Sequence, residues 1–197
     1  MHMPLVILDR DGTVNHDSDD YIKSPEEWVA LPGAIDAIAK LNHAGWRVVI
    51  ASNQSGLGRG LFDVATLNQI HDKMNKALAK AGGRVEAIFY CPHTPDENCN
   101  CRKPLTGLFD QIADRFGVDL KEVHAVGDSL RDAQAAAASG CIPHWVLTGK
   151  GEPFRGKDMP DTFPAHTRMH ADVMAFADWL LAQPALKTTA HTPSSGI

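Results

Sequence analysis

The spacing of apolar residues constrains this chain most, because short β-branched runs alternate with longer stretches of helical periodicity. The run 4–8 has the length of a strand and is followed by the polar stretch 9–13. Further strand-like runs cover 48–50, 85–90, 123–126 and 145–147, and the helical stretches between them begin near residues 34, 63, 106 and 133. This alternation predicts an α/β fold of three layers, a Rossmann-like parallel sheet with helices on both faces. In such sheets, ligands bind beyond the carboxyl ends of the strands.

The C-terminal third of the chain is less regular. Residues 150–170 are rich in Pro, Gly and charge and are predicted to be a loop. Residues 171–183 have the pattern of a short amphipathic helix, and we expect 184–197 to be a flexible tail. A chain of 197 residues can bury one sizeable core, so we predict a single domain over residues 1–183.

Composition excludes some classes of partner. The formal net charge is −5, and the sequence has no run of Lys or Arg of the kind that binds a phosphate backbone, so we expect no nucleic-acid partner. We expect no signal peptide, because the first residues lack a charged region and a long apolar run, and no later apolar stretch is long enough to span a bilayer. The expectation is a cytoplasmic monomer without a membrane partner.

Two aspartates follow the first predicted strand. Asp9 and Asp11 are two residues apart, so at a strand end their side chains can converge on one site while Arg10 points elsewhere. Two carboxylates in one pocket need a cation or a proton between them, and carboxylate oxygens suit Mg²⁺. A solvated surface turn is the alternative interpretation of this motif alone.

Three more polar segments follow predicted strands and fall on the same edge of the sheet: 52–54 (SNQ), 102–104 (RKP) and 127–128 (GD). With DRDGT at 9–13 they resemble, in order and spacing, the four motifs of the haloacid dehalogenase-like phosphatases. The resemblance covers roughly residues 4–150 and implies the fold of that superfamily without a cap domain.

The resemblance also implies roles for individual residues. Asp9 corresponds to the nucleophile that forms an aspartyl-phosphate, and Asp11 to the acid and base. Ser52 would bind phosphoryl oxygens, and Lys103 would neutralise charge on the phosphate and on Asp9. Catalytic Mg²⁺ would be held by Asp9, by the backbone carbonyl of Asp11 and by Asp128, while Asp132 steadies a metal-bound water.

Cysteines crowd into one short stretch. Cys91, His93, Cys99 and Cys101 offer three sulfurs and one imidazole, the ligand set of a closed tetrahedral zinc site. Free thiols are the alternative. A site with four protein ligands has no open position for water, so we expect structural zinc that orders the loop. Cys141 is distant in sequence and is predicted to be a small core residue.

The segments CPHTPDENCNCRKP and SNQSGLGRG resemble the D-glycero-D-manno-heptose 1,7-bisphosphate 7-phosphatase family, which is related to the histidinol-phosphate phosphatases. That family removes the 7-phosphate of the heptose bisphosphate during synthesis of nucleotide-activated heptose, a lipopolysaccharide core precursor. The substrate is a small phosphorylated sugar. In place of the Lys that such proteins often carry after the GD motif, this chain has Ser129, with Arg131 as a possible substitute. The substrate contacts implied by the resemblance are Arg10, Asp17, Asp20, Tyr21, Asn53, Gln54, Ser55, Arg59, Arg102 and Lys103.

Alternatives remain at this point. A histidinol-phosphate phosphatase, or a phosphatase of another small metabolite, would share the same motifs, and the acids from Asp17 to Asp20 would suit a cationic substrate. A DNA 3′-phosphatase would need a basic rim that an acidic chain lacks. A zinc-stabilised interaction domain with a decayed active site is the alternative that is not an enzyme.

Overall fold

The computed structural model describes residues 3–184, and within them six parallel strands form one sheet in the order β3-β2-β1-β4-β5-β6. The strands are β1 (Leu5–Leu8), β2 (Arg47–Asn53), β3 (Ala87–Cys91), β4 (His124–Gly127), β5 (Ile142–Val146) and β6 (Arg168–His170). β1 lies between β2 and β4 and pairs with both. The chain therefore starts in the middle of the sheet and adds strands outward on each side.

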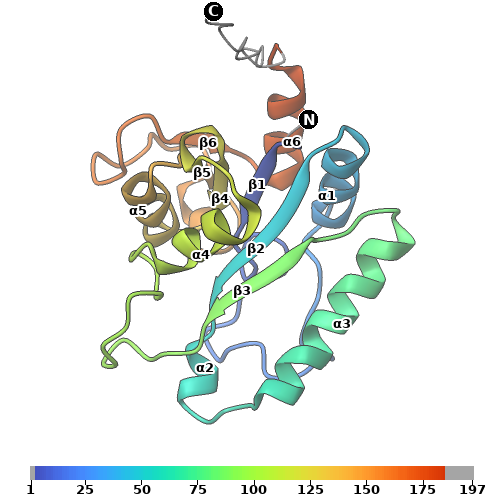
Figure 1. The fold of residues 1–197 in the computed structure, drawn as a ribbon, viewed down its shortest axis with the longest axis vertical. Helices are drawn as coiled ribbons and strands as arrows, with labels where there is room; N and C mark the ends of the chain where they lie inside the picture. The colour runs from blue at the N-terminus through green and yellow to red at the C-terminus, as the bar shows by residue number, and fades with distance from the viewer. Residues whose placement is uncertain (1–2, 185–197) are drawn as a thin grey trace, which may run out of the picture.

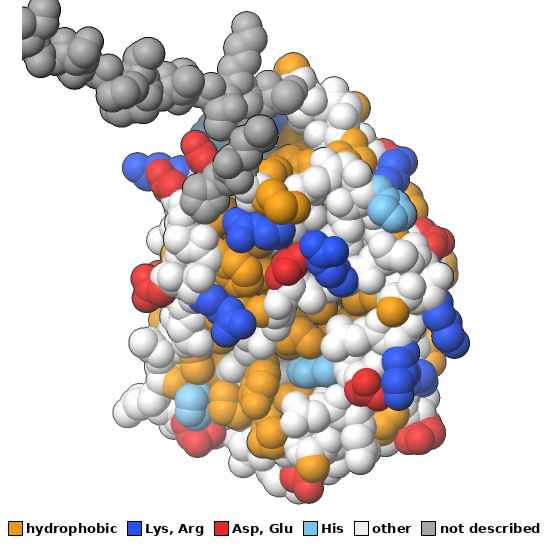
Figure 2. All heavy atoms as spheres, turned by 45° about the vertical axis from the view of Figure 1, so that its right-hand side comes forward, with side chains coloured by type: hydrophobic (Ala, Val, Ile, Leu, Met, Phe, Trp, Pro, Cys, Tyr) orange, Lys and Arg blue, Asp and Glu red, His pale blue; other side chains and the backbone are white. Residues whose placement is uncertain are grey.

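Helices cover both faces of the sheet. On one side lie α1 (Ala34–His43), α3 (Val64–Lys80) and α6 (Val173–Ala182), and on the other α4 (Gly107–Phe116) and α5 (Leu130–Ser139) (Figure 1). Three shorter helices are α2 (Ser55–Gly58), η1 (Leu120–Glu122) and η2 (Gly149–Phe154). On the surface in Figure 2, side chains of Lys and Arg are interspersed with those of Asp and Glu.

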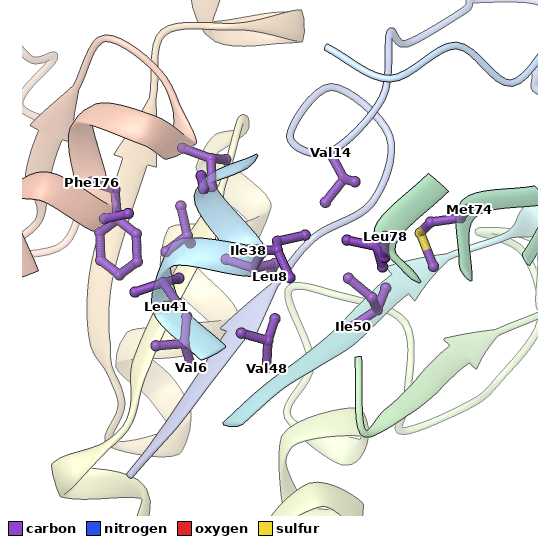
Figure 3. Close-up of a cluster of buried hydrophobic side chains, with 14 of the residues drawn as sticks. Val6, Leu8, Val14, Ile38, Leu41, Val48, Ile50, Met74, Leu78 and Phe176 are labelled. Carbon is purple, nitrogen blue, oxygen red and sulfur yellow. The ribbon is translucent and has the colours of Figure 1, made fainter. Parts of the chain in front are cut away.

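The central strands bury both faces, which is why their residues are almost all apolar. Val6 and Leu8 of β1 join the apolar cluster under α1, α3 and α6 (Figure 3), whereas Leu5 and Ile7 join the cluster under α4 and α5. This alternation is the two-residue period of a strand. Successive residues of β1 thus pack against opposite helix layers.

The elements predicted from residues 4–147 are present, but α5 begins at Leu130 rather than near residue 133 and β5 begins at Ile142 rather than at residue 145. The N-cap of α3 is Asp63, whose carboxylate accepts from the backbone N–H of Thr66 at 2.8 Å. Cys141 is buried and lies apart from the cluster of the other three cysteines, as predicted. Across residues 3–184, no helix combines the length and the apolarity that crossing a bilayer requires.

The prediction that residues 150–170 form only a loop was wrong. This stretch contains most of η2 and the edge strand β6. Its periodicity was too short to detect, because η2 has Gly and Pro in its sequence and β6 has only three residues. The predicted flexible tail lies outside the described residues apart from Pro184, and the single domain over residues 1–183 stays a prediction.

Two long connections leave the carboxyl ends of the strands, which point downward in Figure 1. Residues 9–33 join β1 to α1, and residues 92–106 join β3 to α4. Neither connection contains a helix or a multi-residue strand, so within residues 3–184 no separate cap covers this edge. Both loops instead pack onto the edge where the polar motifs lie.

Three histidines form a buried row on β4, β5 and β6. His124 Nδ1 lies 2.9 Å from His144 Nε2, and His144 Nδ1 lies 3.0 Å from His170 Nε2. Phe176 and Trp179 of α6 pack against all three rings. Burial lowers the pKa of His124 and of His170 to about 4 and, with help from its two neighbours, that of His144 to about 2. All three are therefore neutral in the folded protein at pH 7.

These lowered pKa values predict loss of stability in mild acid. Below about pH 6.5 these three histidines become protonated in the unfolded chain but stay neutral in the folded chain, so the free energy of unfolding falls toward about pH 4. By pH 5 each buried histidine should contribute a loss of about 2 kcal/mol. In urea titrations, the free energy of unfolding should fall between pH 7 and pH 5 by about 2 kcal/mol less for H144Q than for the wild type. H43Q, at an exposed histidine, should keep the full dependence, and equal losses in both variants would contradict the account.

Candidate active site and zinc loop

The carboxyl ends of β1, β2 and β4 bring three polar motifs together. Asp9 follows β1, Ser52 lies near the end of β2, and Asp128 follows β4. They line a cavity of about 230 Å³ beside the loop of residues 9–33. The cavity is lined by Asp9, Asp11, Asp17, Ser18, Asp19, Tyr21, Ile22, Ser52, Asn53, Gln54, Ser55, Arg102, Lys103, Asp128, Ser129, Arg131, Asp132 and Lys150.

A buried lysine lies at the centre of this site. Lys103 is 3 % exposed, and its Nζ donates to Asp9 Oδ1 at 2.8 Å, to Asp132 Oδ1 at 2.6 Å and to the carbonyl of Ala51 at 2.7 Å. Burial by itself would lower the pKa of Lys103, but the two carboxylates raise it above its usual value. The ammonium therefore stays charged, with all three of its protons directed by the protein.

The carboxylates outnumber this cation. Asp9, Asp128 and Asp132 each place an oxygen within 4.8 Å of the others. Burial, with the charge of Asp132, raises the pKa of Asp9 to about 7 against the opposing effect of Lys103. Burial, with the charges of Asp132 and Asp9, raises the pKa of Asp128 to about 9. Asp132 is also buried, but Lys103 and hydrogen bonds from Ser129 hold its pKa below the usual value.

The backbone around Asp128 leaves room for its carboxylate and little else. A Cβ on Gly12 would lie 2.0 Å from Asp128 Oδ2, and Gly12 has a φ of +82°, a conformation that favours glycine. The backbone N–H of Lys150 donates to the same Oδ2 at 2.8 Å. Trp145 Nε1 donates to the carbonyl of Asp128 at 2.8 Å. These contacts fix the orientation of the carboxylate toward Asp9.

Asp11 has a different environment from Asp9. Its carboxylate accepts from Arg10 Nε and Nη2 at 2.9 and 3.1 Å, and from Asn15 Nδ2 and Gln54 Nε2 at 2.9 Å each. Burial would raise the pKa of Asp11, but the Arg10 guanidinium and these hydrogen bonds together lower it. Two aspartates two residues apart thus have pKa values shifted in opposite directions.

Residues 52–54 connect the site to the RKP segment. The side-chain amide of Asn53 makes two hydrogen bonds to Lys103, accepting from its N–H at 3.0 Å and donating to its carbonyl at 3.1 Å. Gln54 Nε2 donates to Ser52 Oγ at 2.8 Å as well as to Asp11. Asn53, predicted to contact substrate, therefore uses its side chain to hold the backbone of Lys103.

Three of the predicted substrate contacts do not line the cavity. Arg10 is fully buried, and its guanidinium is directed at Asp11 and His71. Asp20 and Arg59 are exposed outside the cavity. The alternation of side chains at a strand end directs Arg10 away from the cavity, but a loop has no period that could separate Asp20 from its neighbours.

One residue of the cavity wall was missed. Lys150 lies in η2, where its Nζ donates to Asp17 Oδ2 at 2.8 Å. Only the packing of η2 onto Asp128 brings Lys150 here, and no sequence signal indicated it. Tyr21, which was predicted, has a φ of +66°, unusual for a residue other than glycine, at a turn that lines the cavity.

The four predicted zinc ligands converge. The ligand atoms of Cys91, His93, Cys99 and Cys101 all lie within 4.8 Å of one another, and His93 Nδ1 is 3.4 Å from Cys91 Sγ and 3.3 Å from Cys101 Sγ. The donor set and the distances of His93 from two sulfurs fit tetrahedral zinc, whose bonds to sulfur are about 2.3 Å long. Cys91 Sγ and Cys101 Sγ, which are 2.8 Å apart, would move apart on binding the ion. Arg102 Nη1 donates to the carbonyl of His93 at 3.3 Å, so the loop also positions the RKP segment.

This fold and this site define a hydrolase with an aspartate at the end of the first strand. The family model of the haloacid dehalogenase-like hydrolases matches residues 5–140. The D-glycero-β-D-manno-heptose-1,7-bisphosphate 7-phosphatase of Bordetella bronchiseptica is 59 % identical over 92 % of this chain and 99 % of its own length. The protein of that name from Pseudomonas aeruginosa is 48 % identical over 92 % of this chain and 99 % of its own.

Solved structures agree with these matches. The crystal structure of the Bordetella bronchiseptica D,D-heptose 1,7-bisphosphate phosphatase complexed with magnesium and phosphate has a TM-score of 0.86, at 59 % identity over 91 % of this chain and 98 % of that one. The Burkholderia thailandensis D,D-heptose 1,7-bisphosphate phosphatase has a TM-score of 0.71, at 49 % identity over 91 % of this chain and 99 % of that one. The chain belongs to the haloacid dehalogenase-like hydrolases and, within them, to the D-glycero-D-manno-heptose 1,7-bisphosphate 7-phosphatase family.

The cysteine cluster predicts about one zinc ion per chain. Replacing Cys99 by Ser removes a soft ligand, so C99S should retain much less zinc by mass spectrometry of the metal and should melt at a lower temperature. C141A is the matched control, because Cys141 is buried outside the cluster, and it should keep its zinc. Equal zinc content in the two variants would contradict this assignment.

Proposed function

We propose that this protein is a Mg²⁺-dependent phosphatase that removes the 7-phosphate of D-glycero-D-manno-heptose 1,7-bisphosphate through an aspartyl-phosphate on Asp9. Membership of the family supports the substrate. The observation that carries the chemistry is the pairing of Asp9 with a buried ammonium at 2.8 Å beside two more carboxylates.

Charge balance supports a divalent cation at this site. Ionised Asp9, Asp128 and Asp132 carry three negative charges and Lys103 carries one positive charge, so two negative charges remain. The raised pKa values of Asp9 and Asp128 are the expected result of that excess where burial excludes water. Asp9, Asp128 and the backbone carbonyl of Asp11 would hold Mg²⁺, which supplies positive charge to the carboxylates and to the phosphate oxygens.

Lys103 orients the nucleophile. Its hydrogen bond to Asp9 Oδ1 leaves Oδ2 as the oxygen for attack on phosphorus, and Asp132 on the other side keeps the lysine in place. As the phosphoryl group approaches, the same ammonium offers charge to its oxygens. Ser52, at the end of β2, is placed to bind a phosphoryl oxygen with its hydroxyl hydrogen, since its Oγ accepts from Gln54.

Asp11 would transfer the protons. In the first half-reaction Asp9 forms a bond to phosphorus, the bond from phosphorus to the sugar oxygen breaks, and the proton of Asp11 moves to that oxygen. In the second, water attacks phosphorus, its proton returns to Asp11, and inorganic phosphate leaves Asp9. The lowered pKa of Asp11 suits the second role, and the negative charge of a bound phosphate would raise that pKa for the first.

The cavity wall suggests how the rest of the sugar is held. Arg102 and Arg131 both line it, and burial together with the charge of Arg131 lowers the pKa of Arg102. Two guanidinium groups suit the second phosphate of a bisphosphate. Asp17 and Asp19 also line the wall and would suit the cation of histidinol phosphate instead, which keeps that substrate as the alternative.

Other parts of the assignment remain predictions of ours. We propose a single domain over residues 1–183 that acts as a monomer in the cytoplasm, where reducing conditions keep thiol ligands available for zinc. Nucleic acid is an unfavourable partner at a net charge of −5. The product would enter synthesis of nucleotide-activated heptose for the lipopolysaccharide core.

A substrate panel tests this proposal. Phosphate release from heptose 1,7-bisphosphate should depend on Mg²⁺, stop with a chelator and return when Mg²⁺ is restored. D9N should lose activity by more than about 1,000-fold, as the loss of a nucleophile does in other enzymes. D11N should lose about 100- to 10,000-fold, the usual contribution of general acid and base catalysis.

Histidinol phosphate is the comparison substrate. We expect a lower kcat/KM for it than for the heptose, because it lacks the second phosphate that Arg102 and Arg131 would bind. The heptose assignment fails if histidinol phosphate is hydrolysed equally well. The aspartyl-phosphate mechanism fails if D9N remains active.

A further inference from the structure

Arg10 is a charged side chain without access to solvent. It lies between the two catalytic aspartates in sequence but is 0 % exposed, so its N–H groups must find partners inside the protein. Nε and Nη2 donate to the Asp11 carboxylate, and Nη1 lies 3.1 Å from His71 Nε2. The guanidinium is therefore held from both sides.

His71 has no part in the mechanism described so far. It is on α3, is 7 % exposed and is not among the residues that line the cavity. Because a guanidinium only donates, His71 Nε2 must accept, and the ring must be neutral with its proton on Nδ1. Burial and the charge of Arg10, against the opposite effect of Asp11, lower the pKa of His71 to about 4, which agrees with a neutral acceptor.

The contact from His71 reaches the catalytic carboxylate through one rigid group. A guanidinium is planar, so fixing Nη1 against His71 also fixes the plane of Nε and Nη2 that Asp11 meets in a two-point contact. Asn15 and Gln54 bind the Asp11 carboxylate as well. Without an acceptor at position 71, Arg10 Nη1 would be a buried unpaired donor, and the guanidinium would rotate toward another acceptor.

We propose that His71 is a positioning residue that acts through Arg10 to hold the Asp11 carboxylate where it can pass a proton to the leaving oxygen. The inference rests on the proposed function, because it assigns His71 to the proton transfer in the first half-reaction. His71 itself exchanges no proton with the substrate. Its effect should therefore depend on how much the leaving oxygen needs protonation.

Leaving groups of different basicity test this role. The sugar oxygen of heptose 1,7-bisphosphate leaves as a strongly basic alkoxide unless it is protonated, whereas the oxygen of p-nitrophenyl phosphate leaves readily without a proton. The quantity to measure is kcat/KM, which reports the steps up to transfer of phosphorus to Asp9. For H71L we expect a fall of about 10- to 100-fold on the heptose and of less than about 3-fold on p-nitrophenyl phosphate.

A conservative variant and a matched control accompany this test. H71Q retains an acceptor oxygen near the position of Nε2, so it should restore most of the activity on the heptose. L78A removes a fully buried side chain farther along the same helix, away from Arg10, and should lower stability without changing the ratio of the two kcat/KM values. Melting temperatures of the three variants allow them to be compared at similar stability.

Three results would overturn the inference: equal loss on both substrates in H71L, no loss on either, or no recovery in H71Q. Failure of the proposed function is distinguishable from these, because it would appear in D9N or in the absence of wild-type turnover of the heptose. A wild type that hydrolyses both substrates through Asp9, with H71L unchanged in its leaving-group dependence, would leave the function standing and exclude the role of His71.

Discussion

A buried ammonium between two carboxylates holds this site together. Lys103 is as buried as a core residue, yet it carries a charge and contacts Asp9 and Asp132 at 2.8 and 2.6 Å. A charge in such a place is stable only when it is paired and its protons are all bound. The fold therefore needs the carboxylates as much as the chemistry does, and the residual negative charge they leave calls for a divalent cation.

Placing that lysine requires contact between two segments that are distant in sequence. Lys103 belongs to the connection after β3, but its backbone is held by Asn53 at the end of β2. The cysteine cluster lies in the same connection, directly before Lys103, and Arg102 donates to the carbonyl of His93 within it. A metal on the cysteine side would thus act on catalysis only through the position of the RKP segment, with no open coordination position of its own.

Strand order explains why the motifs meet. Since β1 lies between β2 and β4, the residues that follow these three strands are neighbours although they are numbered near 9, 53 and 128. Behind them, away from the cavity, lies a second set of polar contacts in which Arg10 joins Asp11 to α3. Asp9 is therefore surrounded by the carboxylates at the sheet edge, whereas Asp11 is bound by a guanidinium that α3 holds. This difference gives the two aspartates pKa shifts in opposite directions.

Local signals in the sequence determined the alternation of strands and helices, the parallel sheet, the aspartates at strand ends and the four clustered zinc ligands. These depend on periodicity and on residues near one another in the chain, so they can be recognised without coordinates. Tertiary structure alone decided that Arg10 is buried against His71, that Asn53 holds a backbone, that Asp19 rather than Asp20 lines the cavity, and that Lys150 reaches Asp128. Each of these depends on the path of a loop or on contact between segments far apart in sequence, for which a chain has no repeating signal.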